Sequence, residues 1–246
     1  TNLAVYLDME ASGGGITNKG KAKPKGNLIV QGSASIGVAG KIGKGVKVAG
    51  TLNALCSGTG TTCGDDDTYD YKGDYTMGMW VNLTTKPPGF FARKWINSEG
   101  AYSYWFRDYQ VFYASVSQTW PDSLFGYDAG AKKTFPTGRG YMEGYNTAVT
   151  DVSKALNTWH HIVVVRKTGT TGSFEYYING AKQTTGAGML TGTDGKSFAT
   201  TFAKTNQNSK DPFWLGEFTG SIDEFFAYNK ALSESEIKKI YDAQKE

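Results

Sequence analysis

The feature that most restricts the fold of this chain is a series of short strand-like segments separated by glycine-rich turns. Residues 3–10 (LAVYLDME), 75–83 (YTMGMWVNL) and 222–227 (IDEFFA) are examples, and such segments recur along the chain. A period of two places successive side chains on opposite faces of a strand, and a helical period is almost absent. Many short strands with glycine-rich turns predict an all-β fold, either a β-sandwich or a jelly roll.

One helix is expected, at the C-terminal end of the chain. Ser233 and Glu236 have the spacing of a capping box, and Ile237, Ile240 and Tyr241 fall on one helical face. So few apolar residues cannot stabilise an isolated helix. The helix is therefore expected to pack on the sandwich beside the last strand.

Length and composition favour a single domain. A chain of 246 residues can hold one large all-β domain or two small ones, and no linker or change of composition divides it. We therefore predict one domain over residues 1–246. The net charge of +3 is too weak to indicate nucleic-acid binding, and no apolar run is long enough for direct membrane insertion. The first residue, Thr1, is not a methionine, which indicates a processed or trimmed start.

The two cysteines, Cys56 and Cys63, lie close together in the segment CSGTGTTC. With no neighbouring histidine or further cysteine they form a poor metal site, and they are predicted to form a disulfide. Closing so short a loop contributes ~2–3 kcal/mol in the chain-entropy model. A disulfide indicates an extracellular protein.

Several segments follow the order of motifs in a known domain family. They are residues 5–13 (VYLDMEASG), 40–52 (GKIGKGVKVAGTL), 75–83 (YTMGMWVNL), 157–169 (NTWHHIVVVRKTG), 174–183 (FEYYINGAKQ) and 220–241 (GSIDEFFAYNKALSESEIKKIY). In these motifs the chain resembles the laminin-G-like, concanavalin A-like jelly-roll domains that are common on bacterial surface proteins. The resemblance implies a two-sheet antiparallel jelly-roll sandwich with a short C-terminal helix. Residues 56–75 and the long aromatic loop from residue 119 depart from the family pattern, so the resemblance defines the fold better than the ligand.

A structural calcium site is expected where the two chain ends meet. Asp223 lies in an apolar closing strand and needs a partner if it is buried. The first and last strands are neighbours in this fold, so Asp223 could share a calcium ion with Glu10, helped by backbone carbonyls of residues 13–15. The resemblance implies a calcium site at this place in some family members. Alternatively, Asp223 accepts backbone hydrogen bonds and Glu10 is solvated.

The remaining acidic and histidine clusters are weaker candidates for metal binding. Asp65, Asp66, Asp67 and Asp70 lack the spacing of an EF-hand loop, so a solvated surface is favoured over a second calcium site. His160 and His161 are adjacent on a predicted strand and point to opposite faces, which excludes a paired site. In the family pattern the histidine after tryptophan has a packing role.

The chain is predicted not to be an enzyme. It has no G-x-S-x-G or H-E-x-x-H motif, and it lacks the E-x-D-x-E pattern with which glucanases of this fold place their acid and nucleophile. Separate strands could still assemble a lyase or hydrolase site.

Aromatic residues combined with Arg and Asn suit carbohydrate binding, because rings stack on sugars while the polar groups provide directed hydrogen bonds. The candidate glycan-binding residues are Arg93, Trp95, Trp105, Arg107, Trp120, Tyr127, Arg139, Tyr141, Tyr145 and Asn146. The tryptophans of the predicted strands could instead belong to the core. Lysines crowd the first fifth of the chain, which with Arg139 favours anionic sugars such as sialylated glycans.

These observations predict a lectin module of a secreted or cell-surface bacterial adhesin that binds cell-surface glycans. Such a module is expected to belong to a larger surface protein or appendage, for example a pilus. Two alternatives remain: a polysaccharide-active enzyme or its accessory module, and a structural or protein-binding surface domain.

Overall fold

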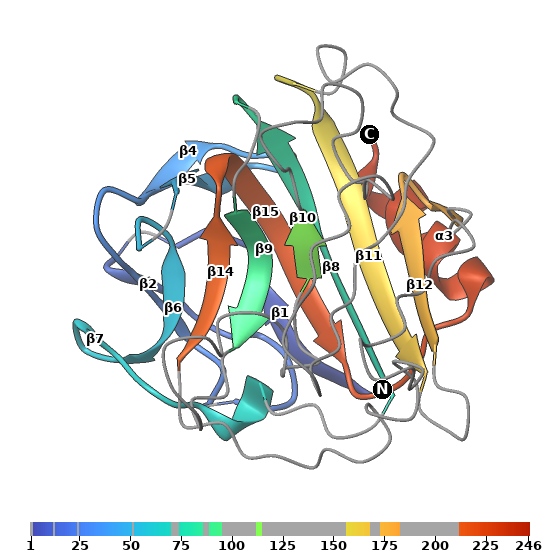
Figure 1. The fold of residues 1–246 in the computed structure, drawn as a ribbon, viewed down its shortest axis with the longest axis horizontal. Coiled ribbons are helices and arrows are strands. Elements are labelled where there is room, and N and C mark those ends of the chain that lie inside the picture. The colour runs from blue at the N-terminus through green and yellow to red at the C-terminus, as the bar shows by residue number, and fades with distance from the viewer. Residues whose placement is uncertain are drawn as a thin grey trace, which may run out of the picture.

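The computed structural model describes residues 2–11, 13–23, 25–50, 52–69, 74–85, 89–94, 112–114, 156–167, 173–182 and 212–246. They form two facing antiparallel sheets with one C-terminal helix, so the predicted sandwich is confirmed (Figure 1). Sheet A runs in the order β13 (Ala181–Lys182), β12 (Ser173–Ile178), β11 (Trp159–Lys167), β8 (Tyr75–Leu83), β15 (Thr219–Tyr228), β5 (Lys44–Ala49) and β4 (Ser35–Ala39), with β1 (Leu3–Leu7) also paired to β15. Sheet B runs in the order β10 (Phe112–Ala114), β9 (Gly89–Lys94), β14 (Phe213–Glu217), β6 (Leu55–Thr59), β3 (Leu28–Val30) and β2 (Gly15–Ile16), with β7 (Thr62–Cys63) paired to β6. A short 3-10 turn, η1 (Asp67–Tyr69), follows β7.

The main core lies between the two sheets. Met77 and Met79 of β8 and Ile222 of β15 belong to the same buried cluster as Leu55 and Phe213 of sheet B. Alternate residues of these strands point into this core, as a period of two requires. β8 is nevertheless buried along almost its whole length, because its other face is covered as well.

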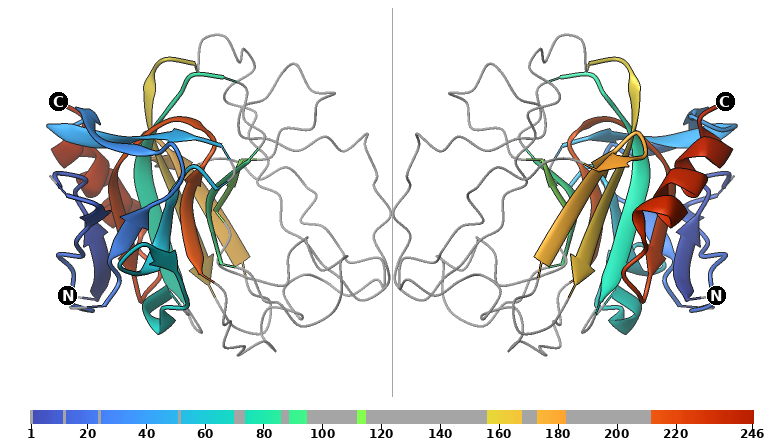
Figure 2. Two further views of the ribbon diagram at one scale, coloured as in Figure 1. Left: turned by 90° about the vertical axis from the view of Figure 1, so that its left-hand side faces the viewer. Right: turned by 90° about the vertical axis from the view of Figure 1, so that its right-hand side faces the viewer.

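The cover on the outer face of sheet A is the helix α3 (Glu234–Gln244) (Figure 2). Ser233 caps the helix in a complete capping box with Glu236, as predicted. Ile237 is fully buried in a second apolar cluster with residues of β11, β12 and β15. This second core consists of Val163, Val165, Tyr177, Phe226, Leu232 and Ile237. The described part of the chain contains no helix long and apolar enough to cross a membrane.

The first and last strands lie side by side, as expected. β15 pairs with β8 along one edge. Two strands share its other edge: β5 pairs with residues 219–222, and β1 pairs with residues 225–228. The register shifts between Asp223 and Phe226, where β5 gives way to β1. This irregularity places Asp223 and Glu224 next to the end of β1.

The predicted disulfide is confirmed. Cys56 of β6 and Cys63 of β7 are bridged, with 5.7 Å between their Cα atoms. Cys56 pairs with Ile29 and with Trp214 across the sheet, and all three belong to a small apolar cluster separate from the main core. The bridge therefore lies on the face of sheet B opposite the core.

Candidate functional sites

Most of the predicted glycan-binding residues lie outside the described part of the chain. Arg93 is in β9, where its backbone is opposite Trp214 of β14. The others, Trp95, Trp105, Arg107, Trp120, Tyr127, Arg139, Tyr141, Tyr145 and Asn146, fall outside the described residues. The glycan site therefore stays a prediction.

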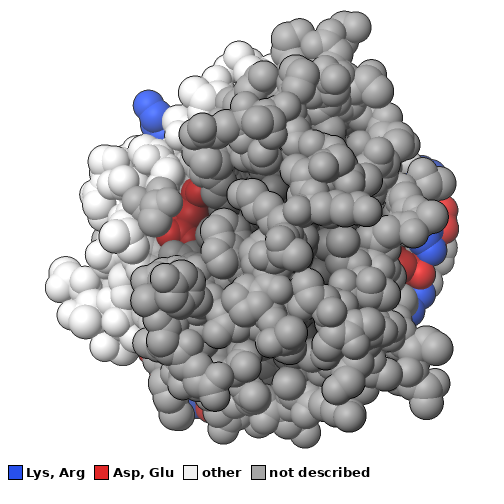
Figure 3. Space-filling model, viewed as in Figure 1, with Lys and Arg blue, Asp and Glu red and all other residues white. Residues whose placement is uncertain are grey.

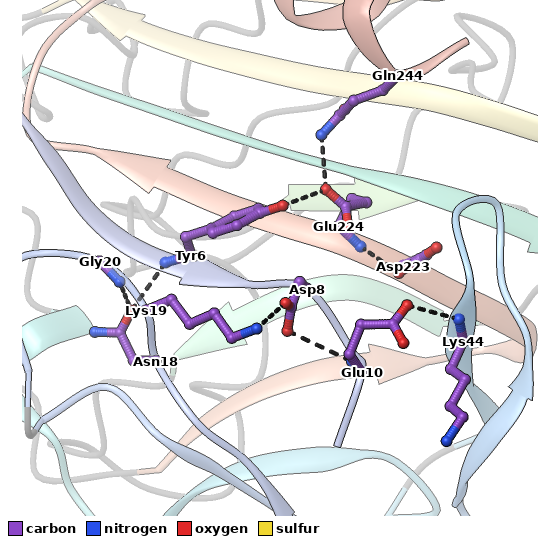
Figure 4. A network of polar contacts seen from close by, with 10 residues as sticks. All are labelled: Tyr6, Asp8, Glu10, Asn18, Lys19, Gly20, Lys44, Asp223, Glu224 and Gln244. Carbon is purple, nitrogen blue, oxygen red and sulfur yellow. Dashed lines mark hydrogen bonds and ion pairs between the residues drawn. The ribbon is translucent and has the colours of Figure 1, made fainter. Parts of the chain in front are cut away.

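The two predicted calcium ligands come together at one turn, residues 40–44, which joins β4 to β5 (Figure 4). Glu10 Oε1 accepts a hydrogen bond from the backbone N–H of Lys44 at 2.7 Å. Asp223 Oδ2 accepts one from the backbone N–H of Ile42 at 2.9 Å, and Oδ1 accepts another from Glu224 at 2.8 Å. The backbone hydrogen bonds expected under the alternative interpretation of Asp223 are thus present. The placement of both carboxylates at one turn is also what a shared ion requires.

Both carboxylates contact the 40–44 turn. Coordination of calcium by the carbonyls of residues 13–15 stays a prediction. The carbonyl of Gly14 accepts a hydrogen bond from Val30, and Gly15 belongs to sheet B. Gly40 and Gly43 leave room for the two carboxylates. A Cβ atom on Gly40 would lie 2.6 Å from Asp223 Oδ2, and one on Gly43 would overlap the carboxylate of Glu10.

Four carboxylates crowd this junction: Asp8, Glu10, Asp223 and Glu224. Asp223 is fully buried, and burial raises its pKa to about 7, against the opposing effect of the Ile42 hydrogen bond. Burial also raises the pKa of Glu224, and the charges of Asp8 and Glu10 add to the effect. Among the described residues, Lys19 forms an ion pair at this junction, with Asp8. A further positive charge would therefore be favourable here.

Glu224 connects the junction to the helix. Its Oε2 atom accepts hydrogen bonds from the hydroxyl of Tyr6 at 2.6 Å and from Nε2 of Gln244 at 2.8 Å (Figure 4). This network could not be predicted from the sequence, because no spacing relates residues 6, 224 and 244.

The backbone is strained on both sides of the junction. Met9, which lies between Asp8 and Glu10, has φ 56°, and Glu224 has φ 53°. A residue other than glycine costs about 1–3 kcal/mol in such a conformation, and strain of this kind gathers at functional sites. Among the described residues, however, no three His, Cys, Asp or Glu side chains are arranged as a metal site.

The second acidic cluster has a local structural role in its described part. Asp66 accepts backbone hydrogen bonds from Gly26 at 2.8 Å and from Thr68 at 2.9 Å, which fixes the start of η1. Asp65 and Asp67 are exposed, and Asp67 forms an ion pair with Lys25. Asp70 lies outside the described residues.

The family comparison decides what kind of domain this is. A family model described as the concanavalin A-like lectin/glucanases superfamily, Laminin_G_3, matches residues 57–238. The chain belongs to this family. The matched segment begins in β6 and includes Asp223, whereas β1 and Glu10 precede it. Because the superfamily description covers both lectins and glucanases, membership alone does not select between binding and catalysis.

Solved structures with the same fold are distant in sequence. The Trypanosoma rangeli sialidase in complex with 2,3-difluorosialic acid matches with a TM-score of 0.54 and 16% identity, over 99% of this chain and 33% of that chain. The binding domain of Paraclostridial Mosquitocidal Protein 1 matches at 0.51 and 14%, over 98% and 52%. The receptor binding domain of botulinum neurotoxin type G matches at 0.50 and 11%, over 99% and 52%. This Laminin_G_3 domain thus spans a third to a half of those chains, and the likeness shows the fold. No curated protein sequence matches it.

Proposed function

We propose that this Laminin_G_3 domain is a carbohydrate-binding lectin module without catalytic activity, carried by a secreted or cell-surface bacterial adhesin. The observation that carries the proposal is the family match over residues 57–238 in a chain that lacks the paired-carboxylate pattern of the glucanases. The disulfide between Cys56 and Cys63 supports an extracellular location, because such bridges persist in oxidising compartments. We further propose that this adhesin is displayed on an appendage such as a pilus.

Sialylated glycans are the proposed ligand class. Lys21, Lys23, Lys44 and Lys47 are exposed, whereas Lys19 and Lys25 are paired with aspartates. Exposed lysines attract anionic sugars, and binding of this kind weakens with added salt. A structural neighbour binds a sialic acid derivative, but at 16% identity that fact belongs to the neighbour.

A glycan array followed by an assay for released sugars tests the proposal. We expect specific binding without turnover, at least about fivefold weaker in Trp120→Ala or Arg139→Gln, because stacking and charge-assisted hydrogen bonds are each worth about 1 kcal/mol or more. Lys239→Gln, which removes an exposed charge on α3, is the control and should bind normally. Product sugars released from polysaccharides would support an enzyme instead. A chain that binds no glycan would support a structural or protein-binding domain.

We also propose that Glu10 and Asp223 hold a structural calcium ion. The residues present fit a hard cation, since two carboxylates converge on one turn and the buried Asp223 has no cationic partner among the contacts described for it. When bound, calcium would supply the positive charge that the four carboxylates lack. Its effect would be to join the first strand, the 40–44 turn and the last strand.

A further inference from the structure

His161 lies in a closed aromatic site between sheet A and α3. Its side chain is fully buried, and its ring centroid is 5.2 Å from that of Trp80 in β8. The ring centroids of Phe226 in β15 and Tyr241 in α3 are each 5.9 Å away. The backbone of His161 is satisfied through Asn179, which accepts its N–H at 2.9 Å.

The imidazole itself has no hydrogen-bond partner within the described structure. Nδ1 and Nε2 of His161 are both buried and unpaired. A buried polar atom without a partner costs about 1–3 kcal/mol, and a buried charge costs considerably more. The site therefore tolerates a neutral imidazole and strongly disfavours an imidazolium.

Among the described residues, no ring or side chain in contact with the imidazole compensates a positive charge. The side chains that face it from β8, β15, α3 and the turn after β12 are Trp80, Phe226, Tyr241 and Asn179, and none of them carries a charge in mild acid. Cations lie at the rim of the site: the Nζ atom of Lys41 lies 5.0 Å from the centroid of the Trp80 ring, and that of Lys245 lies 6.0 Å from the centroid of the Tyr241 ring. Asp223 lies opposite Trp80 in the neighbouring strand, on the side of Trp80 away from His161. Glu224 reaches the rim only through Gln244. Burial accordingly lowers the pKa of His161 from 6.5 to about 4.

Much of the contact between the C-terminal half of α3 and the sheet is made at this site, beside the hydrogen bond from Gln244 to Glu224. Tyr241 contacts the site through its ring. In addition, Gln244 accepts a hydrogen bond from Nε1 of Trp80 at 3.1 Å, and the carbonyl of Lys245 accepts one from Nζ of Lys41 at 2.5 Å. A helix of 11 residues is marginal without packing. Loss of the ring contacts would therefore leave the end of the helix held mainly by the hydrogen bond from Gln244 to Glu224.

We propose that protonation of His161 in acid releases the C-terminal half of α3 from sheet A, which makes the helix an acid-sensitive cover. The imidazolium reaches water only when Tyr241 and the last helical turn move away. Opening uncovers the second core, including Val163, Val165 and Phe226. The core between the two sheets is not involved.

The sign of the pH dependence follows from the lowered pKa. The closed state binds fewer protons than the open state between pH 6.5 and about 4. The equilibrium constant for opening should thus rise up to about tenfold for each unit by which the pH falls through this window. Above pH 6.5 the protonation of His161 should no longer affect the contact between α3 and the sheet.

Hydrogen exchange of residues 234–244 between pH 7 and 4, corrected for intrinsic rates, measures the opening, and NMR of the imidazole follows its titration. We expect His161 to titrate well below 6.5 and helix protection to fall tenfold or more while β8 stays protected. His161→Phe should keep the helix closed at pH 4. If phenylalanine does not fit the site, His161→Gln should still remove the pH dependence of helix opening. The control His160→Gln should behave as the parent chain. An unchanged acid response in both His161 variants, or an imidazole that titrates near 6.5 under a protected helix, would overturn the proposal.

Discussion

Gly37 and Gly43 belong to the same β4–β5 hairpin and both have left-handed backbones, with φ of 83° and 58°. They differ in what a side chain would meet, since a Cβ on Gly37 faces open space and one on Gly43 meets the carboxylate of Glu10. Gly37→Ala should cost about 1 kcal/mol in the free energy of unfolding, from backbone strain alone. Gly43→Ala should cost about 1–2 kcal/mol more, because Glu10 must also release the N–H of Lys44. Urea unfolding of both variants measures the difference, and equal losses would show that the Glu10 contact adds no stability.

At the scale of elements, Glu175 joins three strands at one edge of sheet A. Its Oε1 atom lies 2.8 Å from the ammonium groups of Lys167 in β11 and Lys182 in β13, and its Oε2 atom accepts a hydrogen bond from Tyr177 at 3.0 Å. Figure 3 shows charges of both signs at the right-hand side of the molecule, where Figure 1 draws β12 and α3. Although burial acts to raise the pKa of Glu175, the hydrogen bonds from both lysines and Tyr177 outweigh it and lower the pKa to about 2.

A lowered carboxyl pKa contributes stability that is present above about pH 4.5 and is lost as the pH falls through 2. Glu175→Gln should thus cost about 1 kcal/mol at pH 7, a small value because both lysines are partly exposed. The cost should shrink steadily below pH 4.5. Glu246→Gln, an exposed control, should cost nothing measurable at either pH. A cost for Glu175→Gln that stays constant down to pH 2.5 would contradict the ion-pair explanation.

The elements that the sequence predicted correctly are those specified by neighbouring residues. The capping box at Ser233 and the disulfide of Cys56 with Cys63 depend on spacings of three and seven residues, which fix the geometry almost without tertiary information. The partners of Glu10 and Asp223 were only partly predictable. Their approach followed from the family resemblance, but the turn that receives them is distant in sequence from both. The enclosure of His161 was missed because it depends on where the helix docks.

At the scale of the whole molecule, the junction of Glu10, the 40–44 turn and Asp223 is where the segment after the first strand meets the last strand. The helix is attached to the same place through Glu224 and Gln244. A calcium ion held there would bind only the folded state, and such a ligand adds ~2.7 kcal/mol of stability at a hundredfold excess over its Kd. The melting temperature of chelator-treated protein should therefore rise by several degrees in millimolar calcium.

Variants of Asp223 and Glu10 distinguish the loss of a calcium ligand from the loss of a negative charge elsewhere on the protein. Asp223→Ala should abolish the shift, with Asp223→Asn as the less disruptive replacement, and Glu10→Gln should weaken it. Asp67→Asn removes an exposed carboxylate from the other acidic cluster and should leave the shift intact. Glycan binding by the 119–149 segment should survive these changes at low temperature, because the predicted sugar site does not include the junction. The melting temperature of protein first shown to be metal-free could be the same with chelator and with millimolar calcium. Asp223 would then be an ordinary strand residue that accepts backbone hydrogen bonds, among them those from Ile42, Lys41 and Glu224.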